Sequence, residues 1–274
     1  MPKDGPGLRV VEGLLRRELE ELARDARAAH AFALYDMEHF PEKIRFVSLR
    51  RDGRPVAYLL IWYGDPSKPV VHWAGGTESL PLSMALPEPP FVALVPPEVS
   101  PGVRWPPPGR SFPLELWARS QRGAPIRREP SPAEDPTTCR LTATDRPLLQ
   151  RFSARHGADP PLAALGEADL ERVRLYGTIV EREGSSTLVA VARTLAELPD
   201  VWIVGGVYTE PEERGRGHGR RVTGGLADEA HRSGADCALY VRADNRPALS
   251  VYWSLGFRRI ATRHWVDAGG GPPP

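Results

Sequence analysis

The chain has 274 residues, enough for two domains of ordinary size that each bury a hydrophobic core. Hydrophobic residues make up 41% and charged residues 26%, a balance typical of globular rather than disordered proteins. The formal net charge of +1 argues against a protein that binds nucleic acid or a membrane surface non-specifically.

Cysteine and histidine usage excludes further classes of protein. Cys139 and Cys237 both lie in apolar surroundings typical of strands, where cysteine commonly acts as a small buried hydrophobe. We therefore expect no disulfide framework, and a reducing cytoplasm is favoured. No segment approaches the roughly 18 consecutive apolar residues of a membrane span, and no signal-peptide core is present. The histidines lack His-x-x-x-His spacing, so no metal site is expected.

Residues 1–120 predict an N-terminal α+β domain. Apolar positions recur at helical spacing between Val10 and Met37, which predicts one long helix that Pro41 ends. Asp52-Gly53 marks a hairpin between the first two strands that follow. Five strands are expected, at Ile44–Leu49, Val56–Tyr63, Val70–Trp73, Phe91–Val95 and Leu114–Ala118.

Residues 121–137 have the proline-rich composition of a linker, residues 138–267 predict a second domain, and residues 268–274 a flexible tail. Helices are expected from Asp145 through Arg155, at Leu162–Tyr176, Gly219–Ser233 and Asn245–Leu255. Strands are expected at Cys139–Ala143, Thr178–Arg182, Thr187–Thr194, Val201–Thr209, Asp236–Val241 and Phe257–Val266.

The order of these elements predicts an α+β fold with a central mixed, largely antiparallel sheet flanked by helices. The first half offers a helix, a hairpin and a strand in the same order as the second half. That parallel favours two tandem domains related by a diverged duplication.

The most informative segment is the glycine-rich turn Arg214-Gly-Arg-Gly-His-Gly219, which follows an apolar strand and opens a helix. Such a turn aims several backbone N–H groups at one point, and no side chain blocks a close approach. The positive end of the helix dipole lies there too, so the segment predicts a phosphate site. The alternative is an ordinary helix start whose glycines serve packing.

A second motif some thirty residues later narrows the function. Arg214–Gly219 fits the signature Arg/Gln-x-x-Gly-x-Gly/Ala of the GCN5-related N-acetyltransferases, and Asn245, Ala248, Tyr252 and Leu255-Gly256-Phe257 resemble that family's end motif. The resemblance covers roughly residues 138–266. No comparable glycine turn follows Trp73, so the first half resembles a degenerate copy that has lost cofactor binding.

The resemblance implies the fold of this family and an enzyme that moves an acetyl group from acetyl-CoA to a primary amine, by direct attack in a ternary complex. The backbone of Val207, Tyr208 and Thr209 would pair with the pantetheine arm, and an N–H near Val207 would hold the oxyanion. Asn245 would cap its helix and hydrogen-bond the same arm. The diphosphate would be bound at Gly215, Arg216, Gly217, His218, Gly219 and Arg220, although each arginine, taken singly, could instead be a solvated surface side chain.

Two residues are candidates for catalysis. Tyr252 would protonate the departing thiolate, because a phenol of pKa about 10 can serve a thiol of pKa about 8.5 without a large shift; packing is the alternative role. Glu210 could act as general base through a bound water, whereas Glu212 and Glu213 are expected to be solvated. His218 is expected to point toward solvent.

The expected partners are acetyl-CoA and an amine acceptor, either a small molecule or a peptide, with no nucleic acid, membrane or metal. A monomer is favoured over a homodimer, because paired halves in one chain could replace a second copy. A non-catalytic CoA-binding sensor or scaffold remains an open alternative, since no general base stands out. The sequence leaves the acceptor and the acyl-chain length open.

Overall fold

The computed structural model describes residues 7–107, 110–120, 137–156, 170, 173–182 and 184–269. Nearly all of the expected linker at 121–137, most of the expected helix at Leu162–Tyr176 and most of the expected tail at 268–274 lie outside these residues. By its contacts the chain divides into two compact units. One contains Met1–Leu116, Val241–Asp244 and Arg259–Pro274, and the other contains Trp117–Tyr240 and Asn245–Arg258.

The prediction of a single helix over Val10–Met37 at the start of the first unit was wrong. A strand and two shorter helices take its place: β1 (Leu8–Glu12), α1 (Arg16–Ala23) and α2 (Arg27–His39). Gly13, at φ 89°, follows the strand in the left-handed region, and Ala26, at φ −144°, interrupts the helical run. Pro41 does stop the helix, because the 3-10 turn η1 (Pro41–Lys43) follows α2.

The strands expected in this unit are all present. Asp52 and Gly53 have φ values of 50° and 80° between β2 and β3, as a tight hairpin turn requires. β4 and β5 are parallel, and the other pairs are antiparallel. The order is β1-β2-β3-β4-β5-β12. The strands are β2 (Ile44–Arg51), β3 (Arg54–Trp62), β4 (Val70–Ala74), β5 (Phe91–Val95) and β12 (Arg258–Ala268).

The last strand of the chain thus completes the sheet of the first unit. β12 runs antiparallel to β5, with Trp265 opposite Leu94 and Val266 opposite Ala93. Sequence reasoning assigned residues 138–267 to one domain, whereas the contacts group residues from Arg259 onward with the N-terminal half. β6 (Arg110–Arg119), which contains the strand expected at Leu114–Ala118, is divided between the units.

The first unit has no glycine turn and helix where the second has them. After β4 the chain enters the 3-10 segment η2 (Thr77–Ala85), which packs Leu82 onto one face of the sheet with Leu59 and Trp73. The other face carries Tyr58, whose hydroxyl lies 2.7 Å from Nδ1 of His30 on α2.

In its described part the second unit contains the expected elements, except that Leu175 and Tyr176, the last two residues of the helix expected at Leu162–Tyr176, belong to a strand. Its sheet has the order β7-β8-β9-β10-β11, in which only β10 and β11 are parallel. Its strands are β7 (Thr137–Leu141), β8 (Leu175–Arg182), β9 (Ser185–Glu197), β10 (Val201–Thr209) and β11 (Asp236–Arg242). Its helices are α3 (Arg146–His156), α6 (His218–Arg232) and α7 (Arg246–Ser254). The predicted α+β class with a mixed, largely antiparallel sheet is confirmed.

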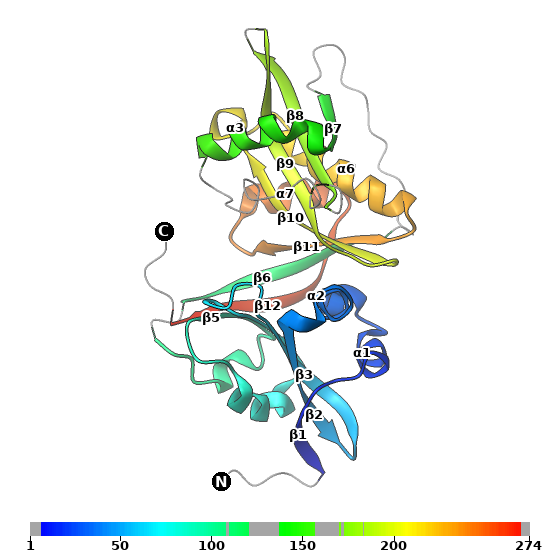
Figure 1. Ribbon diagram of the computed structural model, residues 1–274, viewed down its shortest axis with the longest axis vertical. Helices are drawn as coiled ribbons and strands as arrows, with labels where there is room; N and C mark the ends of the chain where they lie inside the picture. Colours follow the sequence, from blue (N-terminus) through cyan, green and yellow to red (C-terminus); the bar gives the residue numbers. More distant parts are fainter. Residues whose placement is uncertain are drawn as a thin grey trace. The chain divides into compact units, whose positions relative to one another are not determined.

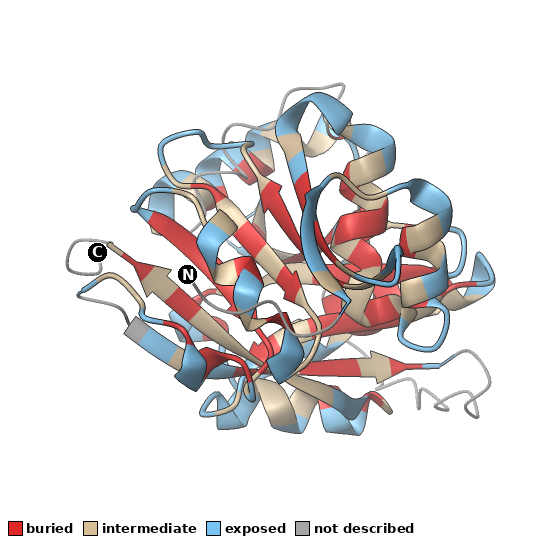
Figure 2. Ribbon diagram, turned by 90° about the horizontal axis from the view of Figure 1, so that it is seen from below, coloured by how far each residue is buried: buried red, intermediate tan, exposed pale blue. Residues whose placement is uncertain are grey.

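Helices α3 and α6 cover opposite faces of this sheet (Figure 1). Side chains alternate between the two faces of a strand, so two consecutive residues of β8 contact different helices. Leu175 belongs to the apolar cluster that contains Phe152 of α3, whereas the ring of Tyr176 lies against Gly225 of α6. The strands are buried along much of their length, and exposed residues gather on loops and on the outward faces of helices (Figure 2).

The first unit contains a buried carboxyl group, that of Asp36, without a polar partner among the described residues. Asp36 on α2 is 8% exposed, and its carboxylate makes no hydrogen bond or ion pair with any residue in the described ranges. Burial raises its pKa to about 7. Because this exceeds the unfolded value near 3.8, ionisation of Asp36 lowers stability progressively as the pH rises from about 4 to about 7.

We therefore predict that Asp36→Asn stabilises the protein at pH 8, by up to roughly 4 kcal/mol, and gives no such gain at pH 4. The measurement is the free energy of unfolding in urea at both pH values. The exposed Asp52→Asn variant is the control and should change neither value appreciably. A gain of equal size at both pH values would contradict this account.

Candidate functional site

The parallel strands β10 and β11 pair over only four residues. Their register runs from Val201 opposite Asp236 to Val204 opposite Leu239 and then stops, although β10 continues to Thr209. Beyond Val204, the β11-facing edge of β10 has no strand partner within the described ranges. Backbone N–H and C=O groups along this edge are therefore without a strand partner among the described residues, and Nε of Arg214 donates to one of them, the carbonyl of Thr209, at 3.2 Å.

The same stretch of β10 also carries a bulge on its other edge. Gly205 pairs with Arg193 of β9 and Tyr208 with Val191, so the two residues between them, Gly206 and Val207, have only one residue opposite. Gly206 has φ 56°, which favours glycine. A bulge of this kind bends and twists a strand. It accounts for the parting of β10 from β11 at this position.

The predicted phosphate turn follows directly. The 3-10 turn η5 (Pro211–Glu213) leads into the loop 214–217, and Gly217 caps α6 with φ 80°. Gly215 also has φ 80°, and a Cβ at either glycine would meet no atom within 4 Å. The left-handed backbone, not packing, therefore demands glycine at both positions.

The backbone amides of this turn have no hydrogen-bond acceptor in the described part of the chain. The N–H groups of residues 215 to 220 make no hydrogen bond to any part of the chain that the structure describes. Glycines 215 and 217 and the side chains of Arg216 and Arg220 are exposed. Free amides at the start of a 15-residue helix, beside exposed cations, form an arrangement suited to a phosphate group.

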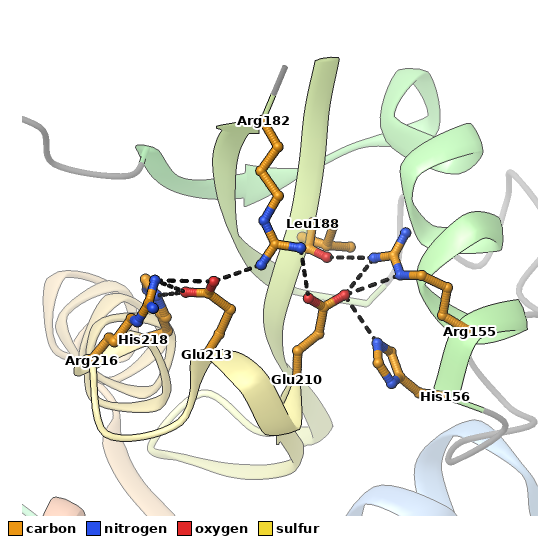
Figure 3. A network of polar contacts seen from close by, with 8 residues as sticks. All are labelled: Arg155, His156, Arg182, Leu188, Glu210, Glu213, Arg216 and His218. Atoms are coloured by element: carbon orange, nitrogen blue, oxygen red, sulfur yellow. Dashed lines mark hydrogen bonds and ion pairs between the residues drawn. The ribbon is translucent and has the colours of Figure 1, made fainter. Parts of the chain in front are cut away.

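Two buried glutamates lie next to this turn, as Figure 3 shows. Glu213 is 6% exposed and Glu210 is 2% exposed. The expectation that Glu213 is solvated was therefore wrong, and so was the outward orientation expected of His218, which is 4% exposed. The reason is mutual pairing, because Nε2 of His218 lies 3.0 Å from Oε2 of Glu213.

Glu210 is surrounded by cationic groups and by histidine. Its Oε1 accepts hydrogen bonds from Nη2 and Nε of Arg155, at 2.5 and 3.1 Å, and lies 2.9 Å from Nε2 of His156 (Figure 3). Its Oε2 lies 3.6 Å from Nη1 of Arg182. A carboxylate in this position already serves as the centre of an ion-pair cluster. The geometry favours a structural role for Glu210 over that of a general base.

Sequence reasoning missed Arg155, His156 and Arg182 as neighbours of the turn. Arg155 lies 55 residues from Glu210, and Arg182 lies 31 residues from Glu213. No local pattern marks such pairs. The edge-on contact of Tyr208 with Phe152 and its tilted contact with His156 also arise only when α3 packs across the sheet.

Helix α7 places the two remaining predicted residues. The side chain of Asn245 accepts a hydrogen bond from the amide of Ala248 at 3.3 Å, so its capping role is confirmed. Tyr252 is 6% exposed and packs against Phe257, with ring centroids 6.0 Å apart. Burial raises the pKa of Tyr252 to about 12, so the assumption of an ordinary phenol pKa was wrong.

Other kinds of site find no support among the residues described. There, no group of three or more histidine, cysteine, aspartate or glutamate side chains is placed to hold a metal ion. No helix within the same ranges is both long and apolar enough to cross a membrane.

Comparison with known proteins identifies the fold. Residues 176–266 match the family described as FR47-like protein. A tandem GNAT protein from the clavulanic acid biosynthesis pathway superimposes with a TM-score of 0.54 at 14% identity, over 97% of this chain and 100% of that one. The chain has the tandem GNAT fold, with an FR47-like domain in its C-terminal half. The resemblance to the GCN5-related N-acetyltransferases noted in the sequence is thereby confirmed.

Several sequence relatives of this chain are named as acetyltransferases. The mycothiol acetyltransferase of Kocuria rhizophila is 34% identical over 130 residues, which are 46% of this chain and 39% of that protein. The mycothiol acetyltransferase of Saccharopolyspora erythraea is 33% identical over 166 residues, 54% of this chain and 52% of that protein. The chain thus spans about half or less of the length of these relatives.

Helix α6, which begins at the glycine-rich turn, approaches the sheet closely. A Cβ added to Gly225 would lie 2.5 Å from Cδ1 of Tyr176, closer than any real contact. This explains why glycine stands at position 225 of α6, although glycine in a helix interior lowers the stability of the helix.

We predict that Gly225→Ala destabilises the protein by about 1–3 kcal/mol, because the helix is pushed off β8. Chemical denaturation measures the loss. In a Tyr176→Ala background the same substitution should instead be neutral, or stabilising by up to about 1 kcal/mol, because alanine favours helix. An equal loss in both backgrounds would rule out the ring contact as its cause.

Proposed function

We propose that this protein is an N-acetyltransferase that moves an acetyl group from acetyl-CoA to a primary amine by direct attack within a ternary complex. One observation carries the proposal: among the described residues, the edge of β10 beyond Val204 has no strand partner, and the turn that follows it has backbone amides without an acceptor. An amide-bearing arm and a diphosphate occur in the same order in coenzyme A. The names of the sequence relatives support the same chemistry.

The donor would bind mainly through the backbone. Val207, Tyr208 and Thr209 would hydrogen-bond the pantetheine arm as an added half-strand, and the amides of residues 215 to 220 would hold the diphosphate. Arg216 and Arg220 are exposed and could reach the phosphates. Asn245 is exposed at the start of α7, where it could serve the arm as well as the cap.

In the transfer step, the amine nitrogen attacks the thioester carbonyl carbon, the C–S bond breaks, and coenzyme A leaves as a thiolate. A proton moved completely from Tyr252 to a thiolate of pKa about 8.5 would travel uphill by roughly 5 kcal/mol. Tyr252 would therefore stabilise the leaving sulfur as a hydrogen-bond donor. The amine gives its proton to water, and positioning of the two substrates supplies much of the rate.

The acceptor is an amine, and the relatives make the acceptor of mycothiol acetyltransferases the first one to test. A cytoplasmic monomer fits the two free cysteines and the paired halves of the chain.

A CoA-binding sensor without turnover is the second candidate. It is favoured by the ion pairs that occupy Glu210, the one predicted base. Thioester consumption with a panel of amines separates the candidates, because a sensor binds acetyl-CoA but consumes none.

We predict that Gly217→Asp abolishes acetyl-CoA binding measured by calorimetry, because it sets a carboxylate against the diphosphate. The matched control is Gly184→Asp. Gly184 has φ 75°, close to the 80° of Gly217, and each has open space around an added Cβ, so the backbone strain is similar. Unchanged affinity in Gly217→Asp, with the control also unchanged, would contradict the phosphate site.

We predict that Tyr252→Phe lowers kcat about a hundredfold and leaves the KM for acetyl-CoA nearly unchanged, since the donor hydrogen bond acts on the leaving group. Stability should change little, because the hydroxyl has no hydrogen-bond partner among the described residues. Steady-state kinetics and thermal unfolding measure the two effects. A kcat within twofold of the unaltered protein would exclude Tyr252 from the step.

A further inference from the structure

The role of Glu213 is not explained by the proposed chemistry. It ends the turn η5, immediately before the loop 214–217, and its side chain is only 7% exposed. A buried carboxylate near a phosphate site is unfavourable on charge alone, because it repels the phosphate and loses its own hydration. Its presence there therefore calls for a compensating function.

The carboxylate of Glu213 is fully compensated by its neighbours (Figure 3). Its Oε1 accepts a hydrogen bond from Nη2 of Arg182 at 2.6 Å, and both oxygens lie 3.2 Å from Nη1 of Arg216. Burial by itself would raise the pKa of Glu213, but hydrogen bonds from Arg182 and His218 and the charge of Arg216 outweigh it and hold the pKa below its usual range. Glu213 is thus a fixed anion.

The contact between Glu213 and His218 closes the loop. These residues lie at its two ends, five positions apart, and are joined by the 3.0 Å contact between Oε2 and Nε2. Nδ1 of His218 lies 3.3 Å from Nη1 of Arg221, and a guanidinium can only donate. Nδ1 must therefore accept, which leaves Nε2–H to donate to Glu213.

Arg182 connects this closed loop to the sheet. It extends from β8 and lies between the two buried glutamates, 2.6 Å from Glu213 and 3.6 Å from Glu210. Glu210 in turn is held by Arg155, which also donates to the carbonyl of Leu188 at 2.9 Å. The ends of the loop are therefore fixed relative to β8, β9 and α3.

We infer that Glu213 is a positioning residue, which holds the loop 214–217 in the shape whose amides bind the diphosphate of the acyl donor. This inference rests on the proposed function. Glu213 itself does not touch the donor. It acts through the hydrogen bond to His218 and the ion pair with Arg182, and it makes the enzyme selective for donors that carry a diphosphate.

Whether Glu213→Gln lowers or raises the Kd for coenzyme A tests this role. If Glu213 were simply an anion near the phosphates, Glu213→Gln would tighten the binding of coenzyme A by removing repulsion. The positioning role predicts the opposite, a Kd for coenzyme A about tenfold higher by calorimetry, since a buried charged hydrogen bond is lost. Glu212→Gln is the matched control, because Glu212 is an exposed neighbour in the same turn and should leave the Kd unchanged.

Kinetics with two donors separate positioning from general damage. Glu213→Gln should raise the KM for acetyl-CoA about tenfold with kcat within about twofold. The acetyl thioester of N-acetylcysteamine lacks the diphosphate, and its kcat/KM should not change. A second variant, His218→Phe, keeps the ring volume and the Arg182 pair and should show the same pattern if Glu213→Gln folds poorly.

Three results would overturn the inference: a Kd for coenzyme A that is unchanged or lower in folded Glu213→Gln, an equal loss with both donors, or unaltered kinetics in His218→Phe. Failure of the proposed function looks different. In that case the unaltered protein transfers no acetyl group, or binds no coenzyme A, before any substitution is made.

Discussion

The candidate site depends on the separation of strands β10 and β11 after Val204, where their pairing ends. Backbone N–H and C=O groups inside a fold are almost always paired, because an unpaired buried group costs about 1–3 kcal/mol. Here the bulge at Gly206 and Val207 bends the strand away, so no strand among residues 7–107, 110–120, 137–156, 173–182 and 184–269 pairs with this edge of β10. That edge has to be satisfied by water or by a ligand of extended, amide-bearing shape.

The ion pairs of Glu210 and Glu213, which follow this edge in the chain, fix the conformation of the glycine-rich turn. Glu210 and Glu213 are both buried, and each is stable there only because arginines reach it from α3 and β8. Breaking one such pair would leave a buried charge uncompensated, which costs several kcal/mol. The loop that carries the free amides is therefore held at its base by interactions that a phosphate does not have to supply.

The sequence predicted the fold and the turn well and the cluster poorly, for physical reasons. Glycine at 215 and 217 indicates a left-handed backbone locally, and the apolar run before the turn indicates β10 directly. The burial of Glu213 and His218 depends on their contact with each other and on Arg182, which is distant in sequence, so both were wrongly expected in solvent. The long first helix was wrong because residues 8–12 form an edge strand whose pattern also fits helical spacing.

Amide resonances of the turn give the most direct test of the account. Backbone nitrogen–proton spectra recorded during a titration with coenzyme A report each N–H group of residues 215 to 220 separately. We expect large shifts and slowed hydrogen exchange at Gly215, Gly217 and Gly219, while Gly184, in the turn between β8 and β9 and with a similar φ, stays unchanged. Saturable binding of coenzyme A that leaves these three glycines unshifted would contradict the account.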